Sequence, residues 1–126
     1  MHRVFPNCLA LLMLVALATV SPGAGAQDVR FLSVIDDLPL MVGLDEDTDA
    51  AMTFDSAQGR IVEAHAAGSV GADKVRAFYA ATLPALGWQG SGEGQFTRGG
   101  EILSLEIEPA GKGAVSVRFA LRPGAR

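Results

Sequence analysis

One stretch of helical spacing, residues 75–88 (VRAFYAATLPALGW), lies between segments that alternate apolar and polar residues. Ser69 or Gly71 is expected to begin the helix, with Asp73 in the first turn, where the helix dipole favours a carboxylate. Apolar residues recur along one face at the spacing of an amphipathic helix. That face comprises Val75, Phe78, Tyr79, Leu83 and Leu86. The helix therefore has one side to bury against the rest of the chain.

The end of this stretch contains three signals that stop a helix. Pro84 lacks a backbone N–H and clashes with the carbonyl four residues earlier, so it is expected to kink or tighten the last turn. Gly87 can adopt the left-handed conformation that ends helices. Trp88 is then expected to fold back on Leu83 or Leu86. We interpret the stretch as the main packing element of the fold and not as a catalytic site.

The segments around the helix predict about five strands. Residues 51–67 are expected to form a hairpin that turns at Gly59, and three further strands are expected at 94–98, 101–109 and 114–123. Gly99-Gly100 is expected to form a two-residue turn, and short hairpins imply antiparallel pairing. The predicted order is β-β-α-β-β-β, which corresponds to a two-layer α+β domain over residues 51–126.

Residues 27–50 lack this regular pattern and are predicted to be an irregular acidic leader. The leader contains the apolar run LPLMVGL (38–44), which has two readings. It covers a sheet edge or the margin of the core, or it is an exposed segment that binds a partner. We favour the first, because a small domain without disulfides needs its apolar residues in the core.

The first 26 residues have the three-part layout of a secretory signal peptide. A basic start with Arg3 precedes an apolar run at 8–20 and the small residues Ala24-Gly25-Ala26, so cleavage is expected near Ala26-Gln27. The apolar run is shorter than the roughly 20 residues of a membrane span. Cys8 lies at the start of this run, where it does not suit a lipoprotein. The sequence predicts a periplasmic or secreted protein without a stable membrane anchor; an uncleaved N-terminal anchor is the alternative.

Composition excludes several kinds of chemistry. Cys8 is the single cysteine, so residues 27–126 can form neither a disulfide, a thiolate nucleophile nor a thiolate metal site. The same residues contain nine Lys and Arg against 14 Asp and Glu, a net charge of −5. They contain no basic stripe, which disfavours binding to nucleic acid.

Charged residues on the predicted strands suggest one pair that could do acid–base or metal chemistry. If Ile61, Glu63 and His65 share a face, His65 lies beside Glu63. We weigh this against an ordinary histidine on a strand surface, which we favour, since His65 is the one histidine after residue 26.

Two further carboxylates, Glu106 and Glu108, are expected opposite Arg118 and Arg122 on the neighbouring strand. We interpret these as cross-strand ion pairs that fix the register and not as paired catalytic carboxylates.

The acidic run DEDTD places Asp45, Asp47 and Asp49 at the spacing of the first ligands of a calcium loop. Ala50 and Ser56 occupy the positions where an EF-hand needs Gly and Glu, so that motif is excluded. A weak irregular calcium site is the remaining alternative to a solvated acidic loop. No nucleophile elbow, P-loop or dinucleotide fingerprint is present in the sequence.

A group of small exported bacterial envelope proteins with no assigned activity resembles this chain. The resemblance rests on FDSAQGRIVEA (54–64), on VRAFYAATLPALGW (75–88), and on F-x-R-x-G-E-x-L (96–103) followed by V-x-V-x-F-x-L-x-P (115–123). In that group a V-x-x-F-Y…L-x-x-x-G-W helix docks on an antiparallel sheet. The resemblance implies the fold and an envelope location, and it implies no catalytic residue.

The leading functional expectation is a non-enzymatic binding or accessory module for another envelope protein, with no cofactor and no metal. One alternative is a small metal-dependent protein or enzyme that uses His65 and Glu63 or the Asp45–Asp49 cluster. Another alternative is a carrier whose small ligand lies between helix and sheet, walled by Phe78, Tyr79 and Trp88.

Overall fold

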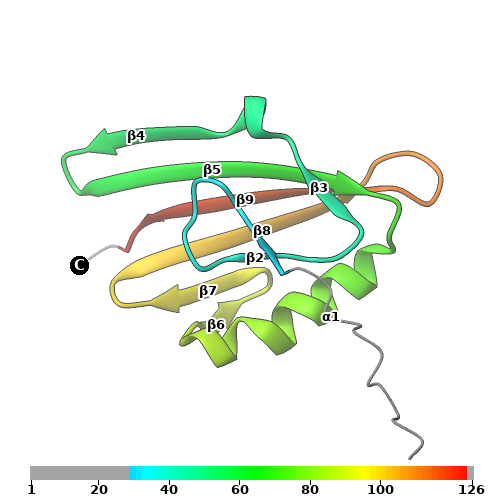
Figure 1. Cartoon of the computed structure of the whole chain (residues 1–126). Coiled ribbons are helices and arrows are strands. Elements are labelled where there is room, and N and C mark those ends of the chain that lie inside the picture. The colour runs from blue at the N-terminus through cyan, green and yellow to red at the C-terminus, as the bar shows by residue number, and fades with distance from the viewer. Residues whose placement is uncertain (1–28, 125–126) are drawn as a thin grey trace, which may run out of the picture.

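The computed structural model describes residues 29–124, and the expected signal peptide lies outside them. One helix, α1 (Ala72–Thr82), packs against one face of an antiparallel sheet, which confirms the α+β class (Figure 1). The main sheet has seven strands: β3 (Leu44–Glu46), β4 (Met52–Ser56), β5 (Gly59–Gly68), β6 (Gln89–Gly92), β7 (Gln95–Arg98), β8 (Glu101–Pro109) and β9 (Val115–Pro123). Two more strands, β1 (Arg30–Phe31) and β2 (Pro39–Leu40), form a small separate sheet.

The expected number of five strands is therefore wrong. The main sheet runs in the order β3-β5-β9-β8-β7-β6, and β4 pairs with β5 on the same edge as β3. The additional strands are β1, β2 and β3 in the leader, and β6 in the glycine-rich run after Trp88 that was expected to be a loop. Gly94 allows the chain to turn from β6 into β7: its φ is +66°, and a Cβ there would lie 2.6 Å from the carbonyl oxygen of Leu105.

Alternation along the long strands gives the main sheet two different faces. The register pairs Leu103 with Leu121, Leu105 with Phe119, and Ile107 with Val117. These apolar side chains lie on the face that packs under the helix, and most of them are buried. Residues between them point to the opposite face, where none of the side chains of β5, β8 and β9 is buried. We call this second side the open face.

Helix α1 buries a narrower stripe than its sequence pattern predicts. Val75, Tyr79 and Leu83 are buried, whereas Phe78 and Leu86 lie at the margin of the core and are only partly buried. The Phe78 ring stands edge-on to the Tyr79 ring, with centroids 4.9 Å apart. Tyr79, rather than Phe78, is therefore the aromatic centre of the helix.

The helix ends as the sequence predicts. A 3₁₀ turn over Pro84–Leu86 follows α1, and Gly87 has a φ of +89°. Gly87 N–H donates to the Pro84 carbonyl, and Trp88 N–H donates to the Leu83 carbonyl at 3.1 Å. This pair of bonds is a Schellman motif, which satisfies carbonyls that the helix end leaves free. It turns Trp88 into the core, where its side chain is buried.

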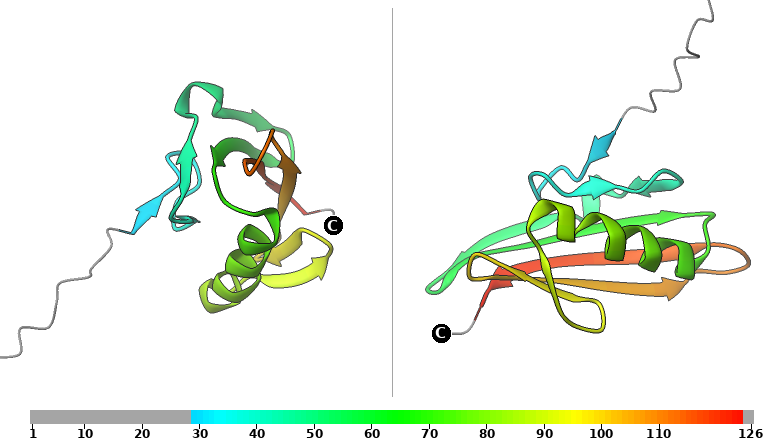
Figure 2. Two further views of the ribbon diagram at one scale, coloured as in Figure 1. Left: turned by 90° about the vertical axis from the view of Figure 1, so that its right-hand side faces the viewer. Right: turned by 90° about the horizontal axis from the view of Figure 1, so that it is seen from below.

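The leader is part of the core. Its apolar residues are buried on the helix side of the main sheet: Leu32, Ile35, Leu38, Leu40 and Leu44. Figure 2 shows β1, β2 and α1 on the same side of the main sheet, so the leader covers the part of the core that the single helix does not reach. For LPLMVGL, the structure agrees with the covering role, although Val42 within it is exposed.

The partial burial of Phe78 leads to a prediction about stability. Leu83→Ala should lower the free energy of unfolding by about 2–5 kcal/mol, because it leaves a cavity under the helix. Phe78→Ala should cost less, about 1–3 kcal/mol, since solvent already reaches part of its ring. Urea denaturation measures both, with the exposed Lys74→Ala as control. A loss for Phe78→Ala as large as that for Leu83→Ala would contradict this description of the core.

Candidate functional site

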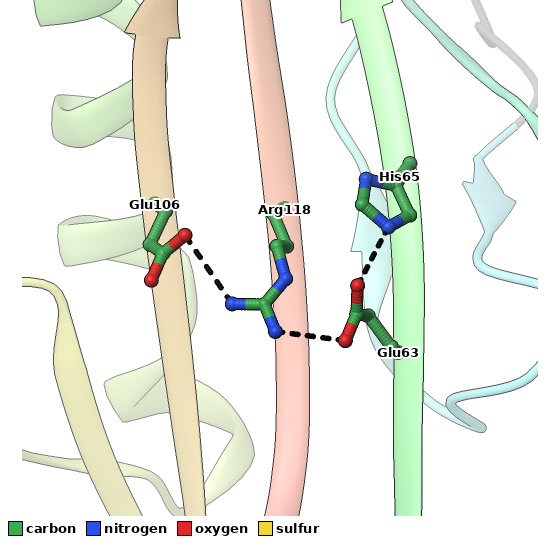
Figure 3. A network of polar contacts seen from close by, with 4 residues as sticks. All are labelled: Glu63, His65, Glu106 and Arg118. Atoms are coloured by element: carbon green, nitrogen blue, oxygen red, sulfur yellow. Dashed lines mark hydrogen bonds and ion pairs between the residues drawn. The ribbon is translucent and has the colours of Figure 1, made fainter. Parts of the chain in front are cut away.

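The open face brings together charged residues from three neighbouring strands. Glu63 and His65 lie on β5, Arg118 lies on β9, and Glu106 lies on β8 (Figure 3). Their side chains share this face because successive side chains of a strand point to opposite faces of the sheet. On β5, for example, Glu63 lies between the core residues Val62 and Ala64. The register places His65 opposite Arg118, and Arg118 opposite Glu106.

Glu63 is the centre of this polar network. One carboxylate oxygen, Oε1, lies 2.8 Å from His65 Nε2, and the other, Oε2, accepts a hydrogen bond from Arg118 Nη2 at 2.8 Å. Arg118 Nη1 also pairs with Glu106 Oε2 at 3.2 Å. Both Glu63 oxygens are therefore occupied by neighbouring side chains.

The Arg118 hydrogen bond lowers the pKa of Glu63 from 4.5 to about 2, and the His65 bond acts in the same direction against the opposing effect of burial. The Glu63 hydrogen bond likewise raises the pKa of Arg118. An effective general base has a pKa near the working pH. Glu63 is far below that range, so the geometry favours a fixed ion pair over acid–base catalysis.

Of the two charge pairs predicted between β8 and β9, one is confirmed and the other is wrong. Glu106 lies opposite Arg118, as expected, but the expected pairing of Glu108 with Arg122 is wrong. Glu108 faces Ser116, and Arg122 faces Ile102. The reason is geometric: antiparallel partners move in opposite directions along the two strands, so fixing one pair separates the other two residues. Arg122 makes no ion pair with any residue from 29 to 124.

Arg122 instead lies in an apolar row that crosses the open face. Ile102 is its register partner on β8, and continuing the β5–β9 register places Ile61 on its other side. Phe54 on the edge strand β4 pairs with Ile61 and is 52% exposed. A groove of about 370 Å³ is lined by Ile61, Ile102 and Arg122, together with Ser56, Gln58 and Pro123. We call Phe54, Ile61, Arg122 and Ile102 the arginine row.

The arginine row has no signature in the sequence pattern. The sequence pattern placed Arg122 opposite Glu108, whereas its register partner is Ile102, and it did not connect Glu63 to Arg118. Both contacts depend on which residues of β5 and β9 stand opposite each other. The alternation of the two strands indicated that these residues share a face, but it contained no signal for the pairing register.

The acidic run of the leader does not converge on a metal site. Asp45 pairs with Arg30 at 3.3 Å, and the Glu46 carboxylate accepts hydrogen bonds from the N–H and hydroxyl of Ser33. Across residues 29–124, no group of three or more His, Cys, Asp or Glu is placed to hold a metal ion. The structure therefore does not bring Asp45, Asp47 and Asp49 together as a group of metal ligands.

A second groove, of about 440 Å³, lies between α1 and the β6–β8 part of the sheet. Tyr79, Phe96, Leu105 and Ile107 contribute apolar lining, and Arg76 and Glu93 also border it. Of the three aromatic walls expected for a ligand carrier, this groove has Tyr79 but neither Phe78 nor Trp88.

Trp88 has a structural environment of its own. The Arg98 guanidinium lies 4.2 Å from the centre of the Trp88 ring, and Arg98 also donates to the Leu86 carbonyl and pairs with Asp37 of the leader at 2.8 Å. Arg98 thus links β7, the helix end and the leader, and was not singled out in the sequence.

Comparison of the chain with protein-family models, curated proteins and solved structures finds no match. Among the helices that the structure describes, none is long and apolar enough to cross a membrane. Inference about the function of this chain therefore rests on the open face and the two grooves.

The lowered pKa of Glu63 predicts a specific acid sensitivity. Its ionised form is favoured in the folded state, so its stabilisation is complete above pH 4.5 and is lost as the pH falls from 4.5 toward 2. Glu63→Gln should therefore reduce the loss of stability over this interval, measured as the urea midpoint against pH. Glu108→Gln is the matched control, since Glu108 makes no ion pair within the described part of the chain. Equal acid sensitivity in the two variants would count against the Glu63 network.

Proposed function

We propose that this protein is a non-enzymatic binding or accessory module for another protein of the bacterial envelope, and that the arginine row is its contact surface. The observation that supports this most is the position of Arg122 between Ile61 and Ile102, on a sheet face that no described segment buries. Protein interfaces are enriched in arginine and aromatic residues, which tend to dominate the binding energy.

The charges of the open face indicate what the partner presents. Arg118 is already neutralised by Glu63 and Glu106, whereas Arg122 has no acidic partner among residues 29–124. A carboxylate from another molecule could pair with Arg122, while an apolar side chain next to it packs against Ile102 or Phe54. We infer that the partner contributes a segment with an acidic and an apolar side chain side by side.

The proposal includes the location of the protein outside the cytoplasmic membrane. The expected signal peptide over residues 1–26 directs the chain to the periplasm or the medium, where an acidic module without disulfides relies on its apolar core for stability. An envelope protein is then the class of partner available to it.

A carrier of a small apolar ligand is a second candidate, which the groove between α1 and β8 supports. Its lining of Tyr79, Phe96, Leu105 and Ile107 is mostly apolar. This groove lies on the helix side of the sheet, opposite to the arginine row. A substitution in the arginine row therefore separates the two candidates, because it should leave ligand binding in the groove unchanged.

Reversal of the Arg122 charge tests the leading proposal. Tagged residues 27–126 should capture a defined protein from an envelope extract of the source bacterium, and Arg122→Glu should reduce that capture at least about tenfold, because it places like charges together. Lys112→Glu, in the exposed β8–β9 turn, makes the same change in charge outside the row and should retain capture. Thermal melting confirms that both variants fold.

Equal recovery with wild type and Arg122→Glu would contradict the arginine row as the contact surface. Recovery of nothing above background, from a chain that melts cooperatively, would contradict the proposed function itself.

A further inference from the structure

The edge strand β4 has a free side. It pairs with β5, and no other strand in residues 29–124 pairs with it. In Figure 1, β4 runs along the border of the main sheet, with the β4–β5 hairpin at one end. A free edge offers unpaired backbone N–H and C=O groups that can pair with another strand.

Most edge strands carry features that prevent such pairing, and β4 has few of them. Proteins protect edges with lysine, proline, bulges or inward charges. β4 (MTFDS) contains neither lysine nor proline, its register with β5 has no bulge, and Asp55 near its end is its single charged residue. It instead exposes two large apolar side chains, Met52 at 51% and Phe54 at 52%.

The other edges of the main sheet differ from β4 in this respect. β3 is three residues long and contains two acids, Asp45 and Glu46. β6 (QGSG) has no apolar side chain, and its pairing with β7 is irregular between Gly90 and Gly92. Among the edges of the main sheet in residues 29–124, β4 is the one built to accept another strand.

We propose that β4 pairs antiparallel with β4 of a second copy of this chain, about a two-fold axis at Phe54. This register pairs all five residues of the strand: Phe54 with Phe54, Met52 with Ser56, and Thr53 with Asp55. Such an interface is isologous and closes, so it forms a dimer and not a filament. The two Phe54 rings become cross-strand neighbours, an arrangement that stabilises paired strands.

The charge of Asp55 and the length of β4 favour this register over those with the two-fold axis at a neighbouring residue. Asp55 faces Thr53 of the second copy, and within its own chain it lies opposite Arg60 on β5. A two-fold axis at Asp55 would place two carboxylates opposite each other, which is destabilising. A two-fold axis at Thr53 would pair only three residues of β4 and would separate the two Phe54 rings.

The dimer would join the two main sheets into one. Because β5 lies between β4 and β9, the open face of each copy would continue into that of the other, and Arg122 would remain two strands away from the interface. Phe54 belongs both to the arginine row and to the proposed dimer axis, whereas Arg122 belongs to the arginine row alone. Self-association is argued from the free edge of β4 and does not depend on the proposed function. Arg122→Glu, which should leave the dimer intact, separates the two proposals.

Two substitutions of opposite charge at residue 54 test the proposed dimer. Light scattering after size exclusion should show a dimer for residues 27–126 and monomers for Phe54→Lys and Phe54→Glu, since each variant places like charges across the axis. Each substitution should weaken dimerisation more than about tenfold. An equimolar mixture of the two variants should recover a heterodimer, because opposite charges then meet. Ser91→Lys on β6 is the control edge and should remain dimeric.

A cysteine at the axis provides an independent readout, because residues 27–126 lack cysteine. Phe54→Cys should form an intermolecular disulfide under mild oxidation, and Ser91→Cys should not. A wild-type chain that stays monomeric at its highest soluble concentration would overturn the proposal. So would a dimer that persists in Phe54→Lys with an unchanged melting temperature, or one that Ser91→Lys abolishes.

Discussion

The phenol of Tyr79 joins the two parts of the layer that covers the sheet. Its hydroxyl donates to the Pro39 carbonyl at 2.9 Å and accepts from the Met41 N–H at 3.2 Å. Burial raises the pKa of Tyr79 to about 12, with the Met41 bond acting in the opposite direction. The phenol is therefore neutral at any physiological pH and keeps its proton for Pro39. Through these two hydrogen bonds, helix α1 and the leader form one continuous layer over the core.

This tertiary contact explains which parts of the fold the sequence could predict. Large apolar residues recur at every second position over 103–107 and 115–121, and Gly87 follows an amphipathic helix, so local patterns were sufficient for β8, β9 and the helix end. In the leader, β1 and β2 have two residues each. A strand that short contains no periodicity to detect. Its position depends on Tyr79, about 40 residues later in the chain, and on the pairing of Arg98 with Asp37.

The open face shows the same division between local and non-local information. The proximity of Glu63 and His65 follows from their spacing of two within one strand, and the sequence analysis anticipated it. The bond from Arg118 to Glu63 and the position of Arg122 beside Ile102 depend on the register between strands. That register makes Glu63 part of a fixed ion pair and places Arg122 beside Ile102, without an ion pair among residues 29–124.

The central claim, that Tyr79 holds the leader on the core, is tested most directly by hydrogen exchange in Tyr79→Phe. Loss of the hydroxyl leaves the buried Pro39 carbonyl and the partly buried Met41 N–H without their partner, at a cost of about 1–3 kcal/mol. The amides of Leu32, Met41 and Leu44 should then exchange about 5–150 times faster, while those in the centre of β8 and β9 change less. Unchanged protection of the leader amides would contradict the claim.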